Sequence, residues 1–175
     1  NWSTISTNNC QNLAGFSTFG VKTDGTLWSW GRNAYGELGL GNTTYYSSPK
    51  QVGALTNWSK VASGNYFALA LKTDGTIWSW GYNVQGQLWF GNTTNYSSPK
   101  QVGALTNWAS IGVSAGTSYG IKTDGTLWSW GSGGNGALSF SKSIISSPKF
   151  YAAEPALQHF SWWNYLLMQN LMRAF

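Results

Sequence analysis

A ten-residue segment recurs three times along the chain at a constant spacing of 50 residues. It reads Lys-Thr-Asp-Gly-Thr-Leu-Trp-Ser-Trp-Gly, with Ile for Leu in the second copy, and it occupies residues 22–31, 72–81 and 122–131. A longer segment that begins Ser-Ser-Pro-Lys and ends Thr-Asn-Trp is identical at 47–58 and 97–108. Such a period indicates a repeat fold, in which each unit buries its apolar surface against its neighbours.

Each unit reads as short strands joined by tight turns. The Asp-Gly pair at 24–25 predicts a hairpin turn, because glycine adopts positive φ at no steric cost. The strand at 27–31 alternates, so Trp28 and Trp30 share one face of a sheet, opposite the smaller residues, and both are expected in the core. We expect the second tryptophan of each such strand to be buried in an equivalent place: Trp30, Trp80 and Trp130.

Two further details constrain the strands. A proline cannot donate to a sheet ladder, so Pro49, Pro99 and Pro148 are expected on edge strands or at strand starts. Trp89 stands where the first unit has Gly39, and that exchange is costly if the turn requires a positive φ.

An all-β repeat of this size predicts a β-propeller. The diagnostic residues are the Thr-Asp-Gly-Thr-Leu-Trp-Ser-Trp-Gly-x-Asn core at 23–33, Gly-Glu-Leu-Gly-Leu-Gly at 36–41, Ser-Pro at 48–49 and Val-Gly at 52–53. They resemble the repeats of the regulator of chromosome condensation family over residues 1–149, in a tryptophan-rich form similar to bacterial and phage versions. The resemblance implies a seven-bladed ring of four-stranded antiparallel blades. We therefore expect an all-β partial propeller of about three and a half blades, half of such a ring.

The repeat also divides the chain. The three units lie near 1–56, 57–106 and 107–149, and the match is poor beyond Lys149. Residues 150–175 are interpreted as a degraded fourth repeat or a divergent tail, with an amphipathic helix as a further alternative. Half a propeller would expose apolar blade faces at both ends. We therefore expect a second copy, or further blades in a longer polypeptide, to close the ring.

Residues that could support catalysis are scarce. The carboxylates Asp24, Asp74 and Asp124 recur in equivalent turns, which favours a structural role. His159 is the sole histidine and Cys10 the sole cysteine, so the chain has no zinc-binding cluster, and no phosphate-binding loop is present. The sequence predicts a protein that is not an enzyme and that has no catalytic residue, bound metal or cofactor.

Differences between nearly identical units indicate where binding residues could lie. The differences cluster just after the Trp-Gly strand and in the Asn-Thr-Thr loop, and loops on a rigid scaffold often carry recognition. Neutral drift on a tolerant surface explains the same pattern equally well. The candidate binding residues are Arg32, Tyr35, Tyr45, Tyr82, Gln85 and Asn95.

The leading functional prediction is a non-catalytic binding or structural module that makes protein–protein contacts in a secreted, cell-surface or virion assembly. A polar surface of low charge suits this role, and a cytoplasmic location stays open. The resemblance implies one alternative, nucleotide exchange on a small GTPase, and the many tryptophans suggest another, lectin-like glycan binding. The ten lysines and arginines are scattered, which argues against a nucleic-acid partner. No apolar run approaches the roughly 20 residues that span a bilayer.

Overall fold

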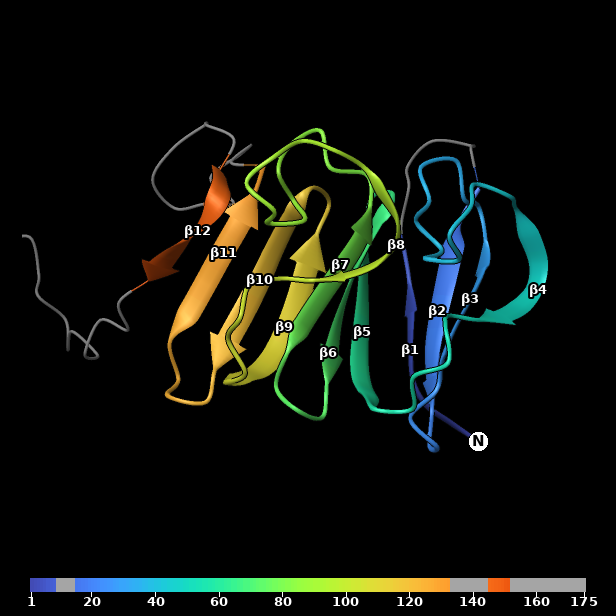
Figure 1. Cartoon of the computed structure of the whole chain (residues 1–175), viewed down its shortest axis with the longest axis horizontal. Coiled ribbons are helices and arrows are strands. Elements are labelled where there is room, and N and C mark those ends of the chain that lie inside the picture. Colours follow the sequence, from blue (N-terminus) through green and yellow to red (C-terminus); the bar gives the residue numbers. More distant parts are fainter. Residues whose placement is uncertain (9–14, 133–144, 152–175) are drawn as a thin grey trace, which may run out of the picture.

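The computed structural model describes residues 1–8, 15–132 and 145–151, the last range through its backbone alone. Three four-stranded antiparallel sheets follow one another along the chain (Figure 1). We call them blades 1, 2 and 3. This arrangement confirms the prediction of an all-β partial propeller with four-stranded antiparallel blades. Residues 152–175, which include most of the expected fourth repeat, lie outside the described residues.

Within every blade the strands pair in chain order. Blade 1 contains β1 (Trp2–Thr7), β2 (Ser17–Lys22), β3 (Leu27–Gly31) and β4 (Tyr46–Gln51). Blade 2 contains β5 (Trp58–Gly64), β6 (Phe67–Lys72), β7 (Ile77–Gly81) and β8 (Tyr96–Gln101). Blade 3 contains β9 (Trp108–Ser114), β10 (Thr117–Lys122), β11 (Leu127–Gly131) and β12 (Ile145–Tyr151). Pro49, Pro99 and Pro148 lie in the edge strands β4, β8 and β12, as predicted.

The Asp-Gly turns have the predicted hairpin role. In blade 1, Gly25 has a φ of 77°, and Asp24 Oδ1 accepts hydrogen bonds from the backbone N and Oγ1 of Thr26 at 2.9 and 2.6 Å. The Thr26 hydroxyl in turn accepts a bond from Trp28 Nε1 at 2.8 Å. The same three bonds recur in blades 2 and 3. The turn therefore fixes both the hairpin and the first tryptophan of the strand that follows.

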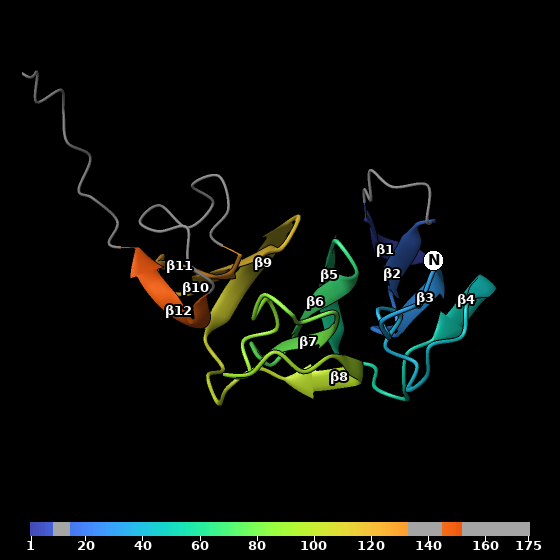
Figure 2. The same ribbon diagram turned by 90° about the horizontal axis from the view of Figure 1, so that it is seen from above.

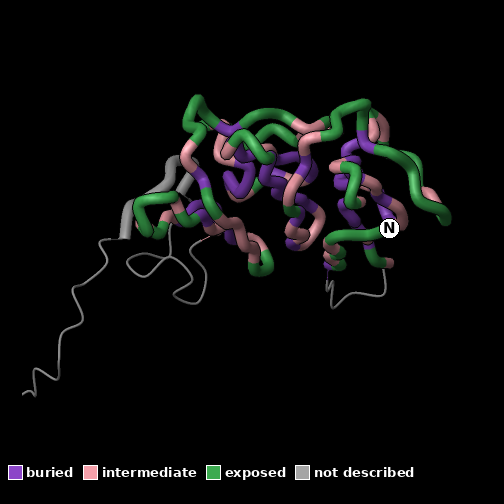
Figure 3. Tube along the Cα trace, turned by 90° about the horizontal axis from the view of Figure 1, so that it is seen from below, coloured by how far each residue is buried: buried purple, intermediate pink, exposed green. Residues whose placement is uncertain are grey.

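The sheets lie side by side in a fan (Figure 2), with β1, β5 and β9 close together and β4, β8 and β12 spread apart. The buried residues concentrate within and between the sheets (Figure 3). Leu27 and Val21 of blade 1 pack in one core with Trp58 and Trp80 of blade 2. An equivalent core joins blades 2 and 3, so each blade presents an aliphatic face to a tryptophan-bearing face.

The second tryptophan of β7 and β11 links neighbouring blades. Trp80 and Trp130 are both 0% exposed. Trp80 Nε1 donates to the main-chain oxygen of Glu37 at 2.8 Å, and Trp130 Nε1 donates to that of Gln87 at 3.0 Å. The prediction of burial is thus confirmed for these two residues.

Trp30 departs from the predicted equivalence. It is only half-buried, because the described residues place no blade against its face, and its ring contacts Trp2 at 5.9 Å between centroids. The first tryptophans of these strands are half-buried as well, not fully in the core: Trp28, Trp78 and Trp128. A lysine ammonium lies 3.8–4.0 Å from the centroid of each ring, a cation–π arrangement. These lysines therefore partly cover aromatic rings.

The long loop after β3 is tied down by a buried amide. Asn33 Oδ1 accepts a bond from Leu38 N at 2.9 Å, and its Nδ2 donates to Thr44 O at 2.9 Å. Gly41 N then donates to Ser97 O of blade 2 at 2.8 Å, so the loop crosses onto the next blade. In the loop after β7, Asn83 Oδ1 likewise accepts a bond from Leu88 N at 2.9 Å, whereas its Nδ2 donates to Asn92 O at 2.9 Å. No helix among the described residues is long and apolar enough to cross a membrane.

Candidate binding surfaces

Three tyrosines gather where blades 1 and 2 meet. The ring of Tyr35, from the loop after β3, lies 5.3 Å from Tyr66 and 4.8 Å from Tyr82 between centroids. Tyr66 and Tyr82 are 6.3 Å apart. The guanidinium carbon of Arg32 lies 4.2 Å from the Tyr66 centroid and 5.2 Å from that of Tyr35. We call these four residues the tyrosine cluster; it unites three of the six candidates chosen from sequence.

Arg32 lies buried beneath the tyrosine rings, so its side chain is not exposed for contact with a partner. Its Nη1 donates to Glu37 Oε1 at 2.9 Å, with the two side chains 9% and 1% exposed. The other carboxylate oxygen of Glu37 accepts a bond from Tyr35 N at 2.6 Å. The buried ion pair therefore fixes the loop that carries Tyr35, whose own side chain is exposed.

The next blade interface replaces the aromatic residues at the equivalent positions with Gln85, Gly116 and Ser132. Gln87 Oε1 accepts a bond from Gln85 N at 2.9 Å, so the neutral amide preserves the turn that Glu37 forms in blade 1. The two loops therefore share the same turn, while the side chains at the blade interface change from aromatic to small or polar.

Two other candidates, Tyr45 and Asn95, lie at the ends of the loops that lead into β4 and β8. Tyr45 is exposed, and Asn95 occupies the equivalent position of blade 2. Asn95 Oδ1 accepts a bond from the backbone N of Asn83 at 2.8 Å, which helps to shape its loop.

Sequence reasoning missed Tyr66. The counterparts of this residue are Phe16 and Gly116, so the position varies as strongly as those that were chosen. Tyr66 lies in the turn between β5 and β6 with a φ of 64°, and its carbonyl accepts a bond from Tyr82 N at 2.8 Å. A comparison of this turn among the units would have identified it.

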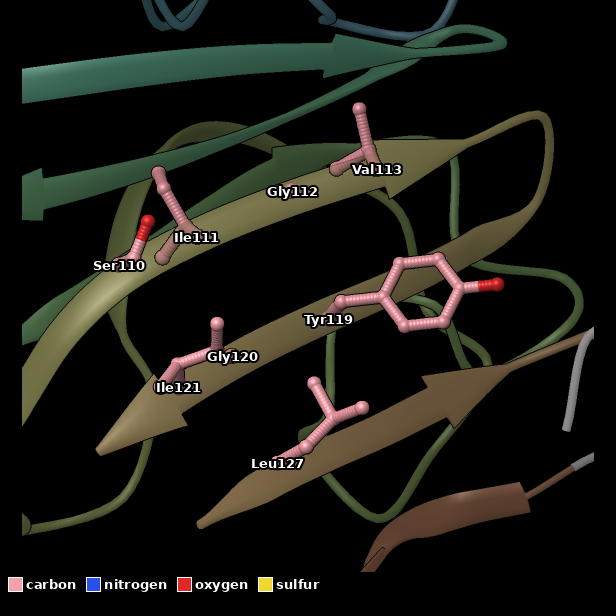
Figure 4. Close-up of a pocket in the computed structure, with 8 residues that line it drawn as sticks. All are labelled: Ser110, Ile111, Gly112, Val113, Tyr119, Gly120, Ile121 and Leu127. Atoms are coloured by element: carbon pink, nitrogen blue, oxygen red, sulfur yellow. The ribbon is translucent and has the colours of Figure 1, made fainter. Parts of the chain in front are cut away.

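The outer face of blade 3 forms a second surface. Figure 4 shows Tyr119, Ile121 and Leu127 on neighbouring strands of this face, beside a cavity of about 300 Å³. Leu127 is 40% exposed and Ile121 is 42% exposed. Their counterparts in blade 2, Ile77 and Leu71, are 0% and 4% exposed because blade 3 covers them. The face has the composition of an interior surface without a covering blade among the described residues.

Comparison with known proteins identifies the repeat. The profile of the Regulator of chromosome condensation (RCC1) repeat matches residues 24–71 and 74–121, together more than half of the chain. A second profile with the same description matches residues 58–87.

This chain belongs to the RCC1 repeat family.

The similarity extends to a mammalian relative and to solved structures. Protein RCC2 of Mus musculus is 43% identical over 53 residues, which are 29% of this chain and 10% of RCC2. Human WBSCR16 superposes with a TM-score of 0.68 at 20% identity, over 77% of this chain and 37% of WBSCR16. Yeast RCC1 (Prp20), solved with Kap60 bound, gives the same score and identity over 77% of this chain and 34% of its own. The chain thus has the RCC1 propeller fold and spans about a third of each solved relative.

The carboxylates in the Asp-Gly turns of these RCC1 repeats are held by hydrogen bonds within the turn. The threonine hydroxyl two residues downstream donates a hydrogen bond that lowers the pKa of the turn carboxylates Asp24, Asp74 and Asp124. The described part of the chain contains no group of three His, Cys, Asp or Glu residues that could hold a metal ion. Cys10 and His159 lie outside the described residues, so the predictions that concern them stay predictions.

Proposed function

We propose that this chain is a non-catalytic propeller module that binds protein partners through preformed surfaces on its RCC1 blades. The observation that carries the proposal is the exposed aliphatic face of blade 3. Leu127 is 40% exposed, whereas the equivalent Leu27 and Ile77 are 0% exposed under the next blade. A contiguous apolar surface of this kind normally marks an interface.

The internal repeat also indicates what covers this face. Blades 2 and 3 cover the aliphatic face before them with two tryptophans each. The opposite open face of the chain, on blade 1, presents their counterparts, Trp2 and Trp30. A covering blade with this composition can come from a second copy packed head to tail or from further blades of a longer polypeptide. Coverage of 34–37% of the solved relatives is consistent with a need for additional blades.

The tyrosine cluster is proposed as the recognition surface. Tyrosine is enriched among the residues that dominate binding energy, because its ring presents a large rigid contact surface at low entropic cost. Tyr35 is exposed above the Arg32–Glu37 pair, and the corresponding surface of the next interface has lost its tyrosines. The differing candidates Tyr45, Gln85 and Asn95 would adapt neighbouring loops to a partner.

Glycan binding is a second candidate function, since tyrosine rings can stack on the apolar faces of sugars. The same cluster is the observation that favours it. We place either function in a secreted, cell-surface or virion assembly; the low proportion of charged residues, 9%, supports that proposal. Protein binding is preferred because the open face of blade 3 is aliphatic, and an aliphatic surface packs against apolar side chains of a protein partner and not against a sugar.

Light scattering on the complete chain tests the main proposal. We expect concentration-dependent association that Leu127→Asp weakens, because the carboxylate would have to be buried without a partner. Leu105→Asp is the control, since Leu105 is similarly exposed at 42% but lies away from the open face. A cooperative, strictly monomeric wild type that Leu127→Asp does not alter would contradict the proposal. A glycan array with wild type and Tyr35→Ala tests the second candidate.

A further inference from the structure

A groove opens between blades 1 and 2, on a different part of the surface from the tyrosine cluster. Its volume is about 330 Å³. Gly39, Leu40 and Val52 line it from blade 1, and Trp58 and Trp78 line it from blade 2. The residues that line this groove carry no charged side chain. It is therefore an aromatic-walled opening at the junction of two sheets, with the Lys72 ammonium 3.8 Å from the centroid of the Trp78 ring.

The equivalent space between blades 2 and 3 is filled by the chain itself. Trp89 replaces Gly39 there, and its ring lies 5.8 Å from Trp108 and 4.8 Å from Trp130 between centroids. Trp108 is the counterpart of the groove residue Trp58. One repeat thus carries an indole at the position where the other has a glycine.

The backbone does not explain the difference. Gly39 has a φ of 73° and Trp89 has a φ of 62°, so both units adopt the same left-handed turn. The steric cost that the sequence predicted for Trp89 is therefore present, and its contacts with Trp108 and Trp130 offset it. The groove at Gly39 occupies the same place in the repeat without an indole. A Cβ at Gly39 would lie 2.7 Å from Trp80 Nε1, so a side chain attached there would have to displace the Trp80 ring.

We propose that this groove binds a tryptophan side chain supplied by a protein partner, in the way that Trp89 fills the equivalent space. The inference deepens the proposed function and rests on it only in that the partner is a protein. The groove is larger than the apolar cavity of about 150 Å³ that accepts benzene in a protein interior. The Lys72 ammonium lies 3.8 Å from the Trp78 ring centroid and 4.9 Å from that of Trp58, so a basic occupant would be repelled and the aromatic lining favours a neutral aromatic group over a cationic one.

The position of the groove suits an extended segment of the partner. It lies beside Gln51, the last residue of β4, and β4 is one of the two edge strands of blade 1. Edge strands offer unpaired backbone groups to an added strand. A segment that lies along β4 can therefore direct its tryptophan between Val52 and Trp58.

The first test uses the complete chain and N-acetyl-tryptophanamide as the probe, with N-acetyl-leucinamide as the comparison. Binding is followed by NMR shifts of the protein's indole N–H groups. We expect one site with a dissociation constant on the order of a millimolar, as is usual for a ligand of this size. Gly39→Trp should abolish it, and Trp89→Gly should open a second site. Equal binding of the two probes, or unaltered binding to a folded Gly39→Trp variant, would overturn the proposal.

Two substitutions at exposed positions provide a second test in case the Gly39→Trp and Trp89→Gly variants do not fold. Leu55 lines the groove and is 44% exposed, and Leu105 is its 42% exposed counterpart at the filled site. Leu55→Asp should weaken probe binding by about tenfold or more, whereas Leu105→Asp should not change it. Equal effects of the two variants would refute the site. Loss of this inference would leave the Leu127 association test of the proposed function unaffected.

Discussion

Replacement of Trp80 by alanine tests whether tryptophans hold the blades together. The side chain is fully buried, and its ring centroid lies 6.3 Å from those of Phe19 and of Trp58. Its Nε1 is bonded to Glu37 O of blade 1 at 2.8 Å. The substitution therefore removes a large core side chain and a hydrogen bond between blades in one step.

The size of the effect follows from this burial. Removal of a fully buried tryptophan costs about 3–5 kcal/mol of unfolding free energy, including the cavity that it leaves. Trp30→Ala is the matched control, because this residue occupies the same place in the repeat but is only half-buried against Trp2. Its cost should be about 1–2 kcal/mol, in proportion to the smaller area removed from water. Trp80→Phe should lie between them, since it keeps a ring but leaves a carbonyl unpaired, a loss of about 1–3 kcal/mol.

Urea denaturation followed by circular dichroism measures these differences, at one protein concentration because association would shift the apparent stability. Equal costs for Trp80→Ala and Trp30→Ala would refute the reasoning, since interblade burial would then contribute nothing. A Trp80→Ala cost below about 1 kcal/mol would refute it as well, because a buried side chain of this size cannot be lost so cheaply.

Three further predictions concern the loops and turns. Arg32→Tyr alone should lower the free energy of unfolding by about 3–5 kcal/mol, because buried Glu37 loses its ion-pair partner. The added Glu37→Gln change should restore most of this free energy, which a double-mutant cycle measures. Gly75→Ala should lower the urea midpoint far more than Gly53→Ala, because both have positive φ but only at Gly75 would a Cβ overlap a backbone carbonyl. Hydrogen bonds lower the pKa of Asp74 in the folded protein. The carboxylate should therefore stabilise the fold fully above its ordinary pKa of 3.8 and lose this effect as the pH falls through the folded-state pKa. The stability of Asp74→Asn, followed by acid titration, should depend less on pH.

The sequence was sufficient for much of the fold because its strongest signals are local. The Asp24-Gly25 turn, the alternating strand 27–31 and the edge prolines each follow from backbone chemistry that operates within a few residues. Because the same pattern recurs three times, the strands expected for one unit could be expected for all three, and the structure has three four-stranded sheets.

The remaining features depend on contacts between distant segments. The half-buried state of Trp30 reflects the absence of a covering blade among the described residues, which no local pattern encodes. Arg32 was chosen because it varies, yet its burial depends on Glu37 and on Tyr66 from the next blade. Tyr66 belongs to the same cluster only because the blades stack. The position of the groove at Gly39 likewise required the neighbouring sheet.

The bonds from Trp80 and Trp130 to the preceding blade have an evolutionary consequence. Both end on main-chain oxygens, those of Glu37 and Gln87, and every residue type supplies such an oxygen. For this hydrogen bond, the duplication, deletion or exchange of a gene segment that encodes one unit therefore needs no compensating mutation. The two loops can then accumulate different side chains, as the change from glutamate to glutamine at this junction illustrates. Recombination between units would thus generate new binding specificities while each new joint remained compatible with its neighbours.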